Sequence, residues 1–476
     1  MIVSRFYESA IAQTSYLIGC AATGEAIAID PNRDVDRYIA AAAREGVSIT
    51  HVTETHIHAD FLSGARELAQ RTGAKLYLSD EGDQDWKYQF ASEATLVRHG
   101  DRIAVGNVVI EVVSTPGHTP EHITFLVTDG AAADRPIAAV TGDFIFVGDV
   151  GRPDLLERAA NMKGTMEKGA RVLWKSLQSF KGHEDWLQIW PGHGAGSACG
   201  KGISAVPYST LGYERRFNWA FNVKTEEAFV ESVLAGQPEP PKYFATMKHL
   251  NKLGPGILGG FHAPPRLDDH RLPDLLARHA LVVDTRAAGE YAAEHLPGTL
   301  NIPMNNAFVN WAGWLLPYSA DLFFIVDDPS EGHTKELVRQ LALIGLDRVA
   351  GVFETTAVAH LASRGTRLAT VPQVTADELA RRTATDGPVV IDVRGATEWS
   401  SGHLPSALHI PLGYLSERID EIPSDRPVVL QCQAGGRSAI AASLLQRAGR
   451  TNISNLVGGF DAWKGAGLPI VTSPAT

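Results

Sequence analysis

Histidine and aspartate residues follow apolar runs at four places in the first half of the chain, within the sequences THIHADF, TPGH, TGDF and PGHG. Any one of these histidines alone would be interpreted as an ordinary core or surface residue. Four such runs at predicted strand ends instead indicate a metal site, because strand ends can bring imidazole and carboxylate ligands of Zn, Fe or Mn together. The candidate side chains are His56, His58, Asp60, His118, Asp143 and His193.

A second reactive pattern, CQAGGRS, begins at Cys432. It follows the apolar run VVLQ and precedes the helical run AIAASLLQRAG. A glycine-containing loop that opens a helix presents backbone N–H groups to an anion. We therefore expect a nucleophilic thiolate at Cys432 that Arg437 stabilises, and a substrate cradle made by Gly435, Gly436 and Ser438.

Residues 1 to about 240 alternate strand-like runs with helical ones. The strand-like runs are IAIDP, SITHVTETH, KLYLSD, VVIEVVSTPGH, ITFLVT, IAAVTGDFIF and LQIWPGH. The runs DVDRYIAAAAREG and LSGARELAQRTG are typical of helices that end at glycine. A proline-rich stretch from Gln237 to Pro241 indicates a domain boundary, followed by a linker over 241–261.

The second half of the chain contains an internal repeat. VVDTRAAGEYAAEHLPGTLNIPM and VIDVRGATEWSSGHLPSALHIPL share Asp, Arg, Glu, an aromatic residue, His-Leu-Pro and Ile-Pro at the same spacing. Asp284 and His295 of the first copy correspond to Asp392 and His403 of the second. The alternation of strands and helices in each copy predicts a parallel sheet with helices on both faces.

The motifs of the first 240 residues resemble those of the metallo-β-lactamase superfamily. Binuclear hydrolases of that superfamily carry HxHxDH, whereas Phe61 takes the last position here. The resemblance to its persulfide dioxygenases, which extends to the run GDVGRPD, implies one Fe(II) per chain, held by His56, His118 and Asp143. Such a set leaves coordination positions open for O₂ and a sulfur ligand.

The same resemblance assigns supporting roles to other residues. His58, Asp60 and His193 would orient the ligands or be remnants of a second metal site. Dioxygenases that use glutathione persulfide often carry an acidic and an aromatic residue after the last histidine motif, where this chain reads GAG, so the thiol carrier stays open. Arg215 is a candidate for binding a substrate carboxylate, or a solvated helix residue. Cys199, a loop cysteine of the kind found near the iron in related fusions, is a candidate sulfur acceptor.

The region from about 372 to the C-terminus resembles the rhodanese family, whose loop pattern is CxxGxRS. The run DVR and the ending GGFDAW match as well. The loop also has the CX5R spacing of a phosphatase, but its context favours rhodanese. The first copy reads DDPSEG at this point, and no cysteine lies between Cys199 and Cys432. Its acidic loop would repel a persulfide or sulfite, so we expect a structural spacer or docking module there.

The predicted architecture is a multidomain α/β and α+β chain of 476 residues. An N-terminal αββα sandwich over 1–240 is followed by two rhodanese-like α/β domains with parallel sheets, over 262–371 and 372–476. A net charge of −11 argues against binding nucleic acid. The sequence shows neither a signal peptide nor a membrane span. Three sparse cysteines (Cys20, Cys199 and Cys432) fit a reducing cytoplasm.

Together, the resemblances imply an enzyme of sulfide detoxification. The iron domain would oxidise a small thiol persulfide with O₂ to sulfite, and Cys432 would transfer sulfane sulfur to sulfite to form thiosulfate. We also expect a homo-oligomer, a dimer or a tetramer. Alternatives are a glyoxalase II-like thioester hydrolase with an added sulfurtransferase, a non-catalytic sulfur-trafficking or persulfide-sensing protein, and a rhodanese that works in reverse to feed the dioxygenase.

Overall fold

The computed structural model describes residues 1–155, 157, 164–383 and 387–472, and it divides into two compact units. The first unit comprises Met1–Phe261 and Arg339–Gly345, and the second comprises His262–Val338 and Leu346–Thr476. Among the described residues, no helix has the length and apolar character needed to cross a membrane.

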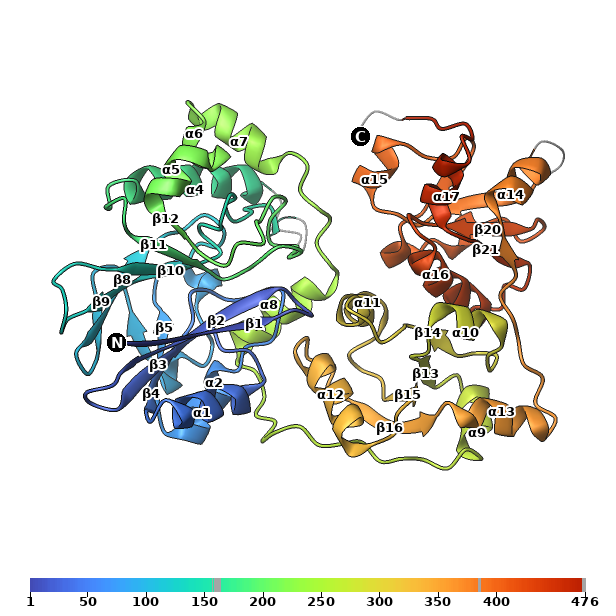
Figure 1. Cartoon of the computed structure of the whole chain (residues 1–476), viewed down its shortest axis with the longest axis horizontal. Helices are drawn as coiled ribbons and strands as arrows, with labels where there is room; N and C mark the ends of the chain where they lie inside the picture. Colours follow the sequence, from blue (N-terminus) through green and yellow to red (C-terminus); the bar gives the residue numbers. More distant parts are fainter. Residues whose placement is uncertain (156, 158–163, 384–386, 473–476) are drawn as a thin grey trace. The chain divides into compact units, whose positions relative to one another are not determined.

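Two six-stranded sheets form the centre of the first unit (Figure 1). The first has the order β1-β2-β3-β4-β5-β6, with bounds β1 (Ile2–Glu8), β2 (Gln13–Cys20), β3 (Glu25–Ile29), β4 (Ser48–Thr53), β5 (Lys75–Ser79) and β6 (Thr95–Val97). The second has the order β12-β11-β10-β9-β8-β7, with bounds β7 (Arg102–Val105), β8 (Val108–Ser114), β9 (Ile123–Asp129), β10 (Ala138–Gly142), β11 (Gln188–Pro191) and β12 (Ser209–Thr210).

Helices cover the outer faces of both sheets, which makes an αββα sandwich. Alternation along β3 shows how the layers pack, because successive strand side chains point to opposite faces. Ala26 and Ala28 face a core shared with helices, whereas Ile27 and Ile29 face the core between the sheets. The helices are α1 (Val35–Arg44), α2 (Ala65–Thr72), η1 (Gln84–Trp86), η2 (Ala91–Glu93), α4 (Thr165–Phe180), α5 (Leu211–Phe217), α6 (Trp219–Asn222), α7 (Glu226–Leu234) and α8 (Tyr243–Leu253).

The predicted strand and helix runs of the first half correspond to β3, β4, β5, β8, β9, β10, β11, α1 and α2. The predicted linker over 241–261 is wrong, because it contains α8 and belongs to the first unit. Tyr243 and Met247, one helical turn apart, are buried on the same side of α8. The apolar face of α8 is therefore buried within the first unit, although the proline-rich stretch before the helix favours a domain boundary.

Two parallel sheets form the second unit, as predicted. The four-stranded sheet has the order β14-β13-β15-β16, with bounds β13 (Leu281–Asp284), β14 (Leu300–Asn301), β15 (Leu322–Val326) and β16 (Val349–Glu354). The five-stranded sheet has the order β17-β21-β20-β18-β19, with bounds β17 (Gln373–Val374), β18 (Val389–Asp392), β19 (Leu408–His409), β20 (Val428–Gln431) and β21 (Ile453–Leu456).

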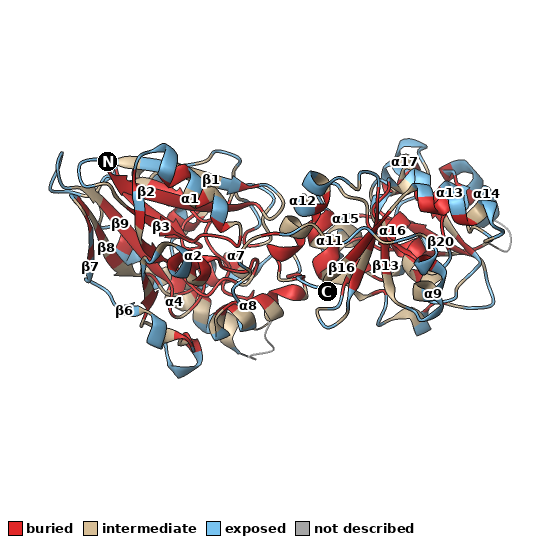
Figure 2. Cartoon of the chain, turned by 90° about the horizontal axis from the view of Figure 1, so that it is seen from below, coloured by how far each residue is buried: buried red, intermediate tan, exposed pale blue. Residues whose placement is uncertain are grey.

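Helices flank each of these sheets, and buried residues (red in Figure 2) concentrate in the strands. The helices in the region of the four-stranded sheet are α9 (Arg271–Ala277), α10 (Ala288–Ala293), α11 (Phe308–Leu315), α12 (Glu331–Ala342) and α13 (Thr356–Ser363). The helices in the region of the five-stranded sheet are α14 (Ala376–Thr383), α15 (Ala396–Ser401), η3 (Leu412–Tyr414), η4 (Ile419–Glu421), α16 (Gly436–Arg447) and α17 (Gly459–Gly465).

The two copies of the repeat form the same local structure. In the first copy Arg286 Nη2 donates to Asp284 Oδ2 at 2.7 Å, and in the second Arg394 Nη2 donates to Asp392 Oδ2 at 2.7 Å. These ion pairs lie at the carboxyl ends of β13 and β18, where both aspartates are buried. The matched Asp and Arg residues therefore hold the turn that follows each strand.

Strand register shows which residue of the first copy replaces the reactive cysteine. Asp284 lies opposite Ile325, and Asp392 lies opposite Gln431. The next residue along the chain is Val326 in the first copy and Cys432 in the second. Valine cannot carry sulfur, so the expectation that the first copy lacks a sulfurtransferase cysteine agrees with the register.

Candidate metal centre and cysteine site

His56, His118 and Asp143 come together although they lie far apart in the sequence. They follow β4, β8 and β10, and their ligand atoms lie within 4.8 Å of one another. Asp143 Oδ2 is 4.0 Å from His56 Nε2 and 3.5 Å from His118 Nε2. All three side chains are buried.

Hydrogen bonds orient both imidazole rings. His118 Nδ1 donates to the carbonyl oxygen of Arg152 at 2.9 Å, which leaves Nε2 as the lone-pair atom that faces Asp143. His56 Nδ1 lies 2.9 Å from Thr55 Oγ1, which in turn donates to Asp30 Oδ2 at 2.9 Å. The chain thus fixes which nitrogen of each ring points into the site.

The donor set fits a metal ion. Among the described residues, His56 Nε2 and Asp143 Oδ2 are buried without a hydrogen-bond partner. Buried polar atoms are rarely left in this state, and a bound cation would satisfy both. Burial also holds the pKa of His56 and of His118 below the usual range, so both imidazoles are neutral and able to act as ligands.

Glycines allow the backbone to pack tightly around Asp143. Gly142, which precedes it, has a φ of 48°, and a Cβ atom there would lie 2.4 Å from Thr55 Oγ1. A Cβ atom on Gly151 would lie 1.8 Å from the carbonyl oxygen of Asp143. Larger residues at either position would move the candidate ligand.

His193 contacts one of the candidate ligands, Asp143, and also Asp60. Its Nδ1 lies 2.7 Å from Asp143 Oδ1, and its Nε2 lies 2.7 Å from Asp60 Oδ2. Burial alone would lower the pKa of His193, but the two carboxylates raise it well above its usual value. A protonated ring therefore joins the two acids. The ligand atoms of His193, Asp60 and Cys199 also lie within 4.8 Å of one another, but a protonated His193 has no lone pair for a metal.

His58 pairs with Asp30 rather than with the candidate ligands, although its ring lies beside that of His56, with centroids 4.2 Å apart. Its Nε2 pairs with Asp30 Oδ1 at 3.1 Å, and its ring packs against Phe61 with centroids 4.4 Å apart. Burial lowers the pKa of His58, but Asp30 more than offsets this and raises it to about 9. Asp30 is thus a supporting residue that the sequence reasoning missed. It lies in the predicted run IAIDP, directly after β3, with a φ of 52°, a conformation that Asp tolerates.

Cys199 and Arg215, the predicted sulfur acceptor and substrate-binding residue, both have partners within the fold. Cys199 is buried, and burial together with Asp143 and Asp60 raises the pKa of its thiol well above the usual value. Arg215 pairs with Asp185 and donates to the carbonyl oxygen of Lys181. Arg215 is thus engaged by these two partners, and its assignment to a substrate carboxylate stays a prediction.

Cys432 lies in a loop of the predicted kind. The backbone N–H of Gly435 donates to its Sγ at 3.1 Å, and Ser438 Oγ donates to it at 3.4 Å. The helix α16 begins at Gly436, so its N-terminal end faces the thiol. Gly435 has a φ of 97°, which an L residue rarely adopts. These donors stabilise negative charge on sulfur.

In the described part of the chain Arg437 makes no hydrogen bond to the Cys432 sulfur, but it lines the same cleft and interacts with Cys432 through its charge, so its stabilising role stays a prediction. Its two terminal nitrogens donate to the two carboxylate oxygens of Glu398, both at 2.6 Å. A bidentate pair of this kind neutralises the guanidinium. Arg437 therefore holds α15 against the cysteine loop.

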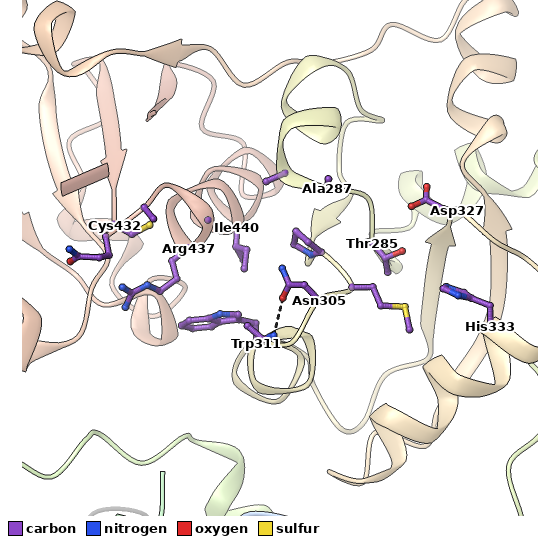
Figure 3. Close-up of a pocket in the computed structure, with 16 residues that line it drawn as sticks. Thr285, Ala287, Asn305, Trp311, Asp327, His333, Cys432, Arg437 and Ile440 are labelled. Carbon is purple, nitrogen blue, oxygen red and sulfur yellow. Dashed lines mark hydrogen bonds between the residues drawn. The ribbon is translucent and has the colours of Figure 1, made fainter. Parts of the chain in front are cut away.

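Both copies of the repeat line one cleft of about 610 Å³ at Cys432 (Figure 3). Cys432, Arg437 and Ile440 come from the second copy. The first copy contributes the residues Thr285, Ala287, Ala288, Pro303, Met304, Asn305, Ala307, Trp311, Asp327 and His333. The first copy is therefore more than a spacer, because its side chains form one wall of the cysteine site. Sequence alone gave no sign of this long-range arrangement.

Comparisons with known proteins agree with this division. Residues 10–193 match the family model of the metallo-beta-lactamase superfamily, and residues 375–466 match that of the rhodanese-like domain. A solved structure described as a metallo-beta-lactamase from Staphylococcus aureus subsp. aureus COL is 43% identical, with a TM-score of 0.66. The alignment covers 74% of this chain and 98% of that one.

Two curated proteins match one part each. A sulfurtransferase of Allochromatium vinosum is 38% identical over 21% of this chain and 95% of its own length. A hydroxyacylglutathione hydrolase of Rhodospirillum rubrum is 32% identical over 36% of this chain. This chain spans only 61% of that hydrolase, so the similarity does not extend to the whole enzyme.

Proposed function

This chain belongs to the metallo-β-lactamase superfamily and carries a rhodanese-like domain, and from that premise we propose that it is an iron-dependent persulfide dioxygenase coupled to a sulfurtransferase. The substrates would be a small thiol persulfide and O₂, with sulfite and thiosulfate as products. The three free cysteines agree with a reducing cytoplasm, where we place the reaction.

The two-histidine, one-aspartate set is the observation that carries this proposal. His56, His118 and Asp143 would hold one Fe(II), which supplies a redox-active centre with open positions for O₂ and sulfur. Thr55 and the Arg152 carbonyl would keep the histidine rings oriented. His193 would hold the second carboxylate oxygen of Asp143, so that only Oδ2 is directed toward the metal.

The proposed oxidation balances without any further reductant. One R–S–S⁻, one O₂ and one water give R–SH, sulfite and one proton. The outer sulfur is oxidised and O₂ is reduced. Surrounding side chains exclude bulk water, because His56, Asp143 and His193 are each about 1% exposed. Such a site can limit side reactions of a reactive sulfur species.

Cys432 would carry out the second reaction. Its thiolate attacks the outer sulfur of R–S–SH, and the S–S bond of the donor breaks as R–S⁻ leaves. The enzyme persulfide then passes that sulfur to sulfite and forms thiosulfate. Gly435 and Ser438 would stabilise the thiolate before attack and again when it is released.

Metal analysis of anaerobically purified protein, combined with O₂ uptake, tests the proposal. We expect about one iron per chain, little zinc, and O₂ uptake that depends on an added persulfide. His118→Ala should lose both iron and O₂ uptake. Two zinc ions per chain without O₂ uptake would contradict the dioxygenase assignment.

A thioester hydrolase is the second candidate, because the chain resembles a hydroxyacylglutathione hydrolase over part of its length. Phe61 stands where a binuclear hydrolase has a metal-binding histidine, which favours the dioxygenase. Hydrolysis of a hydroxyacylglutathione thioester by the metal-loaded protein, at a rate that His118→Ala abolishes, would favour the hydrolase instead.

A further inference from the structure

The cleft at Cys432 has room for much more than the reacting sulfur atoms. Its volume of about 610 Å³ lies within the range of roughly 300–1,000 Å³ that is usual for organic ligands. Cys432 lies at one end, and Asp327 and His333 lie at the other (Figure 3). An inorganic anion such as thiosulfate would fill only the cysteine end.

Charge differs between the two ends. The Arg437 guanidinium at the cysteine end is neutralised by Glu398. Asp327 is exposed to solvent and, within the described part of the chain, makes no hydrogen bond or ion pair. It acts through space on Arg286, whose guanidinium is already paired with Asp284. The Asp327 end therefore favours a cation.

The wall between the two ends is largely apolar. Trp311 and Met304 of the first copy line it together with Ile440 of the second. Figure 3 shows Trp311 and Ile440 between Cys432 and Asp327. Apolar side chains that flank a path of this kind favour a hydrocarbon segment of the ligand, because both surfaces leave water on binding.

We propose that the sulfur donor of Cys432 is the persulfide of an extended thiol, with an apolar middle and a protonated amine at its far end. The amine lies at Asp327, and the apolar segment lies against Trp311. The cysteine-less copy thereby sets the specificity of the site in the other copy. This inference rests on the proposed sulfur-transfer role of Cys432.

The transfer step itself needs no other reactant. The Cys432 thiolate bonds to the outer sulfur of the donor, the donor S–S bond breaks, and the amine-bearing thiol leaves as its thiolate. Asp327 and Trp311 touch the carrier rather than the reacting atoms. They are therefore specificity residues, and their loss should change the choice between donors more than the maximal rate.

The neighbouring acid provides a matched control. Asp328 accepts hydrogen bonds from the backbone N–H and the hydroxyl of Ser330, both at 2.8 Å, and does not line the cleft. Asp328→Asn removes the same charge one residue away and keeps side-chain hydrogen-bonding capacity. Any effect of Asp327→Asn that Asp328→Asn lacks belongs to the cleft.

Two persulfides that differ in one group test the proposal in the full-length protein. The persulfide of 6-aminohexanethiol carries the amine, and that of 6-mercaptohexan-1-ol carries a hydroxyl in its place. The rate at which Cys432 gains sulfur is measured by rapid quenching and peptide mass spectrometry. We expect Asp327→Asn to lower the rate of sulfur transfer from the amine donor about fivefold at low donor concentration and to leave the rate with the hydroxyl donor unchanged. Asp328→Asn should leave the rate with both donors unchanged.

Trp311→Leu should slow both donors about tenfold, because it removes contact area shared by their hydrocarbon chains. Equal rates for the two donors in the wild type, or equal losses in Asp327→Asn and Asp328→Asn, would overturn the proposal. If another cysteine of the Cys432→Ser variant gains sulfur at the wild-type rate, the proposed role of Cys432 is contradicted instead. The two failures are therefore distinct.

Discussion

His193 joins Asp143 to Asp60 through hydrogen bonds of 2.7 Å at each of its two ring nitrogens. Asp143 is a candidate metal ligand, and Asp60 belongs to the motif that binds a second metal in related hydrolases. Burial alone would raise the pKa of Asp143, yet the charge and the hydrogen bond of the protonated His193 bring it well below its usual range. The same histidine thus keeps the ligand ionised and engages the groups that a second metal would need.

His193→Ala should weaken iron binding without abolishing it. The three ligands remain, but Asp143 loses the partner that fixes its orientation, and losses of this kind typically reduce metal affinity by about 10- to 100-fold. Competition with a chelator measures the affinity, and His118→Ala serves as the variant that binds no iron. An unchanged affinity in His193→Ala would show that the hydrogen bond does not support the site.

Phe61→His should add a second metal site. The imidazole would complete the HxHxDH motif beside Asp60, His193 and Asp143. Metal analysis after incubation with excess zinc should then give about two ions per chain, against about one for the wild type. Phe61→Leu controls for the loss of the ring and should stay at one. Two ions in the wild type would show that Phe61 does not limit the site.

Glu398→Gln should release the charge of Arg437 into the cysteine cleft. The variant should bind thiosulfate more tightly, which a lower KM in the thiosulfate-to-cyanide assay would reveal. It should also be less stable at pH 7 by about 1 kcal/mol, a modest value because the pair is partly exposed. A higher KM for thiosulfate would contradict this account.

The stability effect of Glu398 should depend on pH. Burial would raise the pKa of Glu398, but Arg437 lowers it below its usual value. A lowered folded-state pKa stabilises the fold above the unfolded value of about 4.3, and this contribution is lost as pH falls through the folded-state pKa. Urea unfolding of the wild type and Glu398→Gln should therefore differ at pH 7, and the difference should shrink as the pH falls below about 4.3.

Cys199 should resist alkylation in the metal-free protein. Burial and the nearby carboxylates of Asp143 and Asp60 raise the pKa of its thiol, so little thiolate forms at pH 8. Iodoacetamide labelling followed by peptide mass spectrometry should therefore modify Cys199 more slowly than Cys432. Faster labelling of Cys199 would identify it as the more reactive thiol and make it the next candidate sulfur carrier.

Local patterns in the sequence predicted much of the fold and the residues that gather at both candidate sites. His56, His118 and Asp143 each follow an apolar strand, and strand periodicity can be recognised from short runs. The Cys432 loop was predictable for the same reason, since its glycines and the following helix are adjacent in sequence. Repeat spacing also identified the structural match of Asp284 and Asp392.

Pairings between distant residues could not be predicted in this way. Arg215 lies 30 residues from its partner Asp185, and Arg437 lies 39 residues from Glu398. Neither separation leaves a periodic signal. Asn251 donates to the carbonyl oxygens of His58 and Phe61 at 2.8 and 2.7 Å, from a helix in a segment predicted to be a linker. Tertiary packing alone determines these contacts.

Product analysis of Cys432→Ser tests the two-site account most directly. Cys432 is not among the candidate metal ligands, so O₂ uptake with a persulfide substrate should stay close to the wild-type rate. The product should change from mainly thiosulfate to mainly sulfite, as measured by bimane labelling and chromatography. His56→Ala should show the reverse, with no O₂ uptake but thiosulfate formed from added sulfite and persulfide. Thiosulfate produced by Cys432→Ser at the wild-type rate, where sulfite and persulfide do not combine spontaneously, would contradict the account.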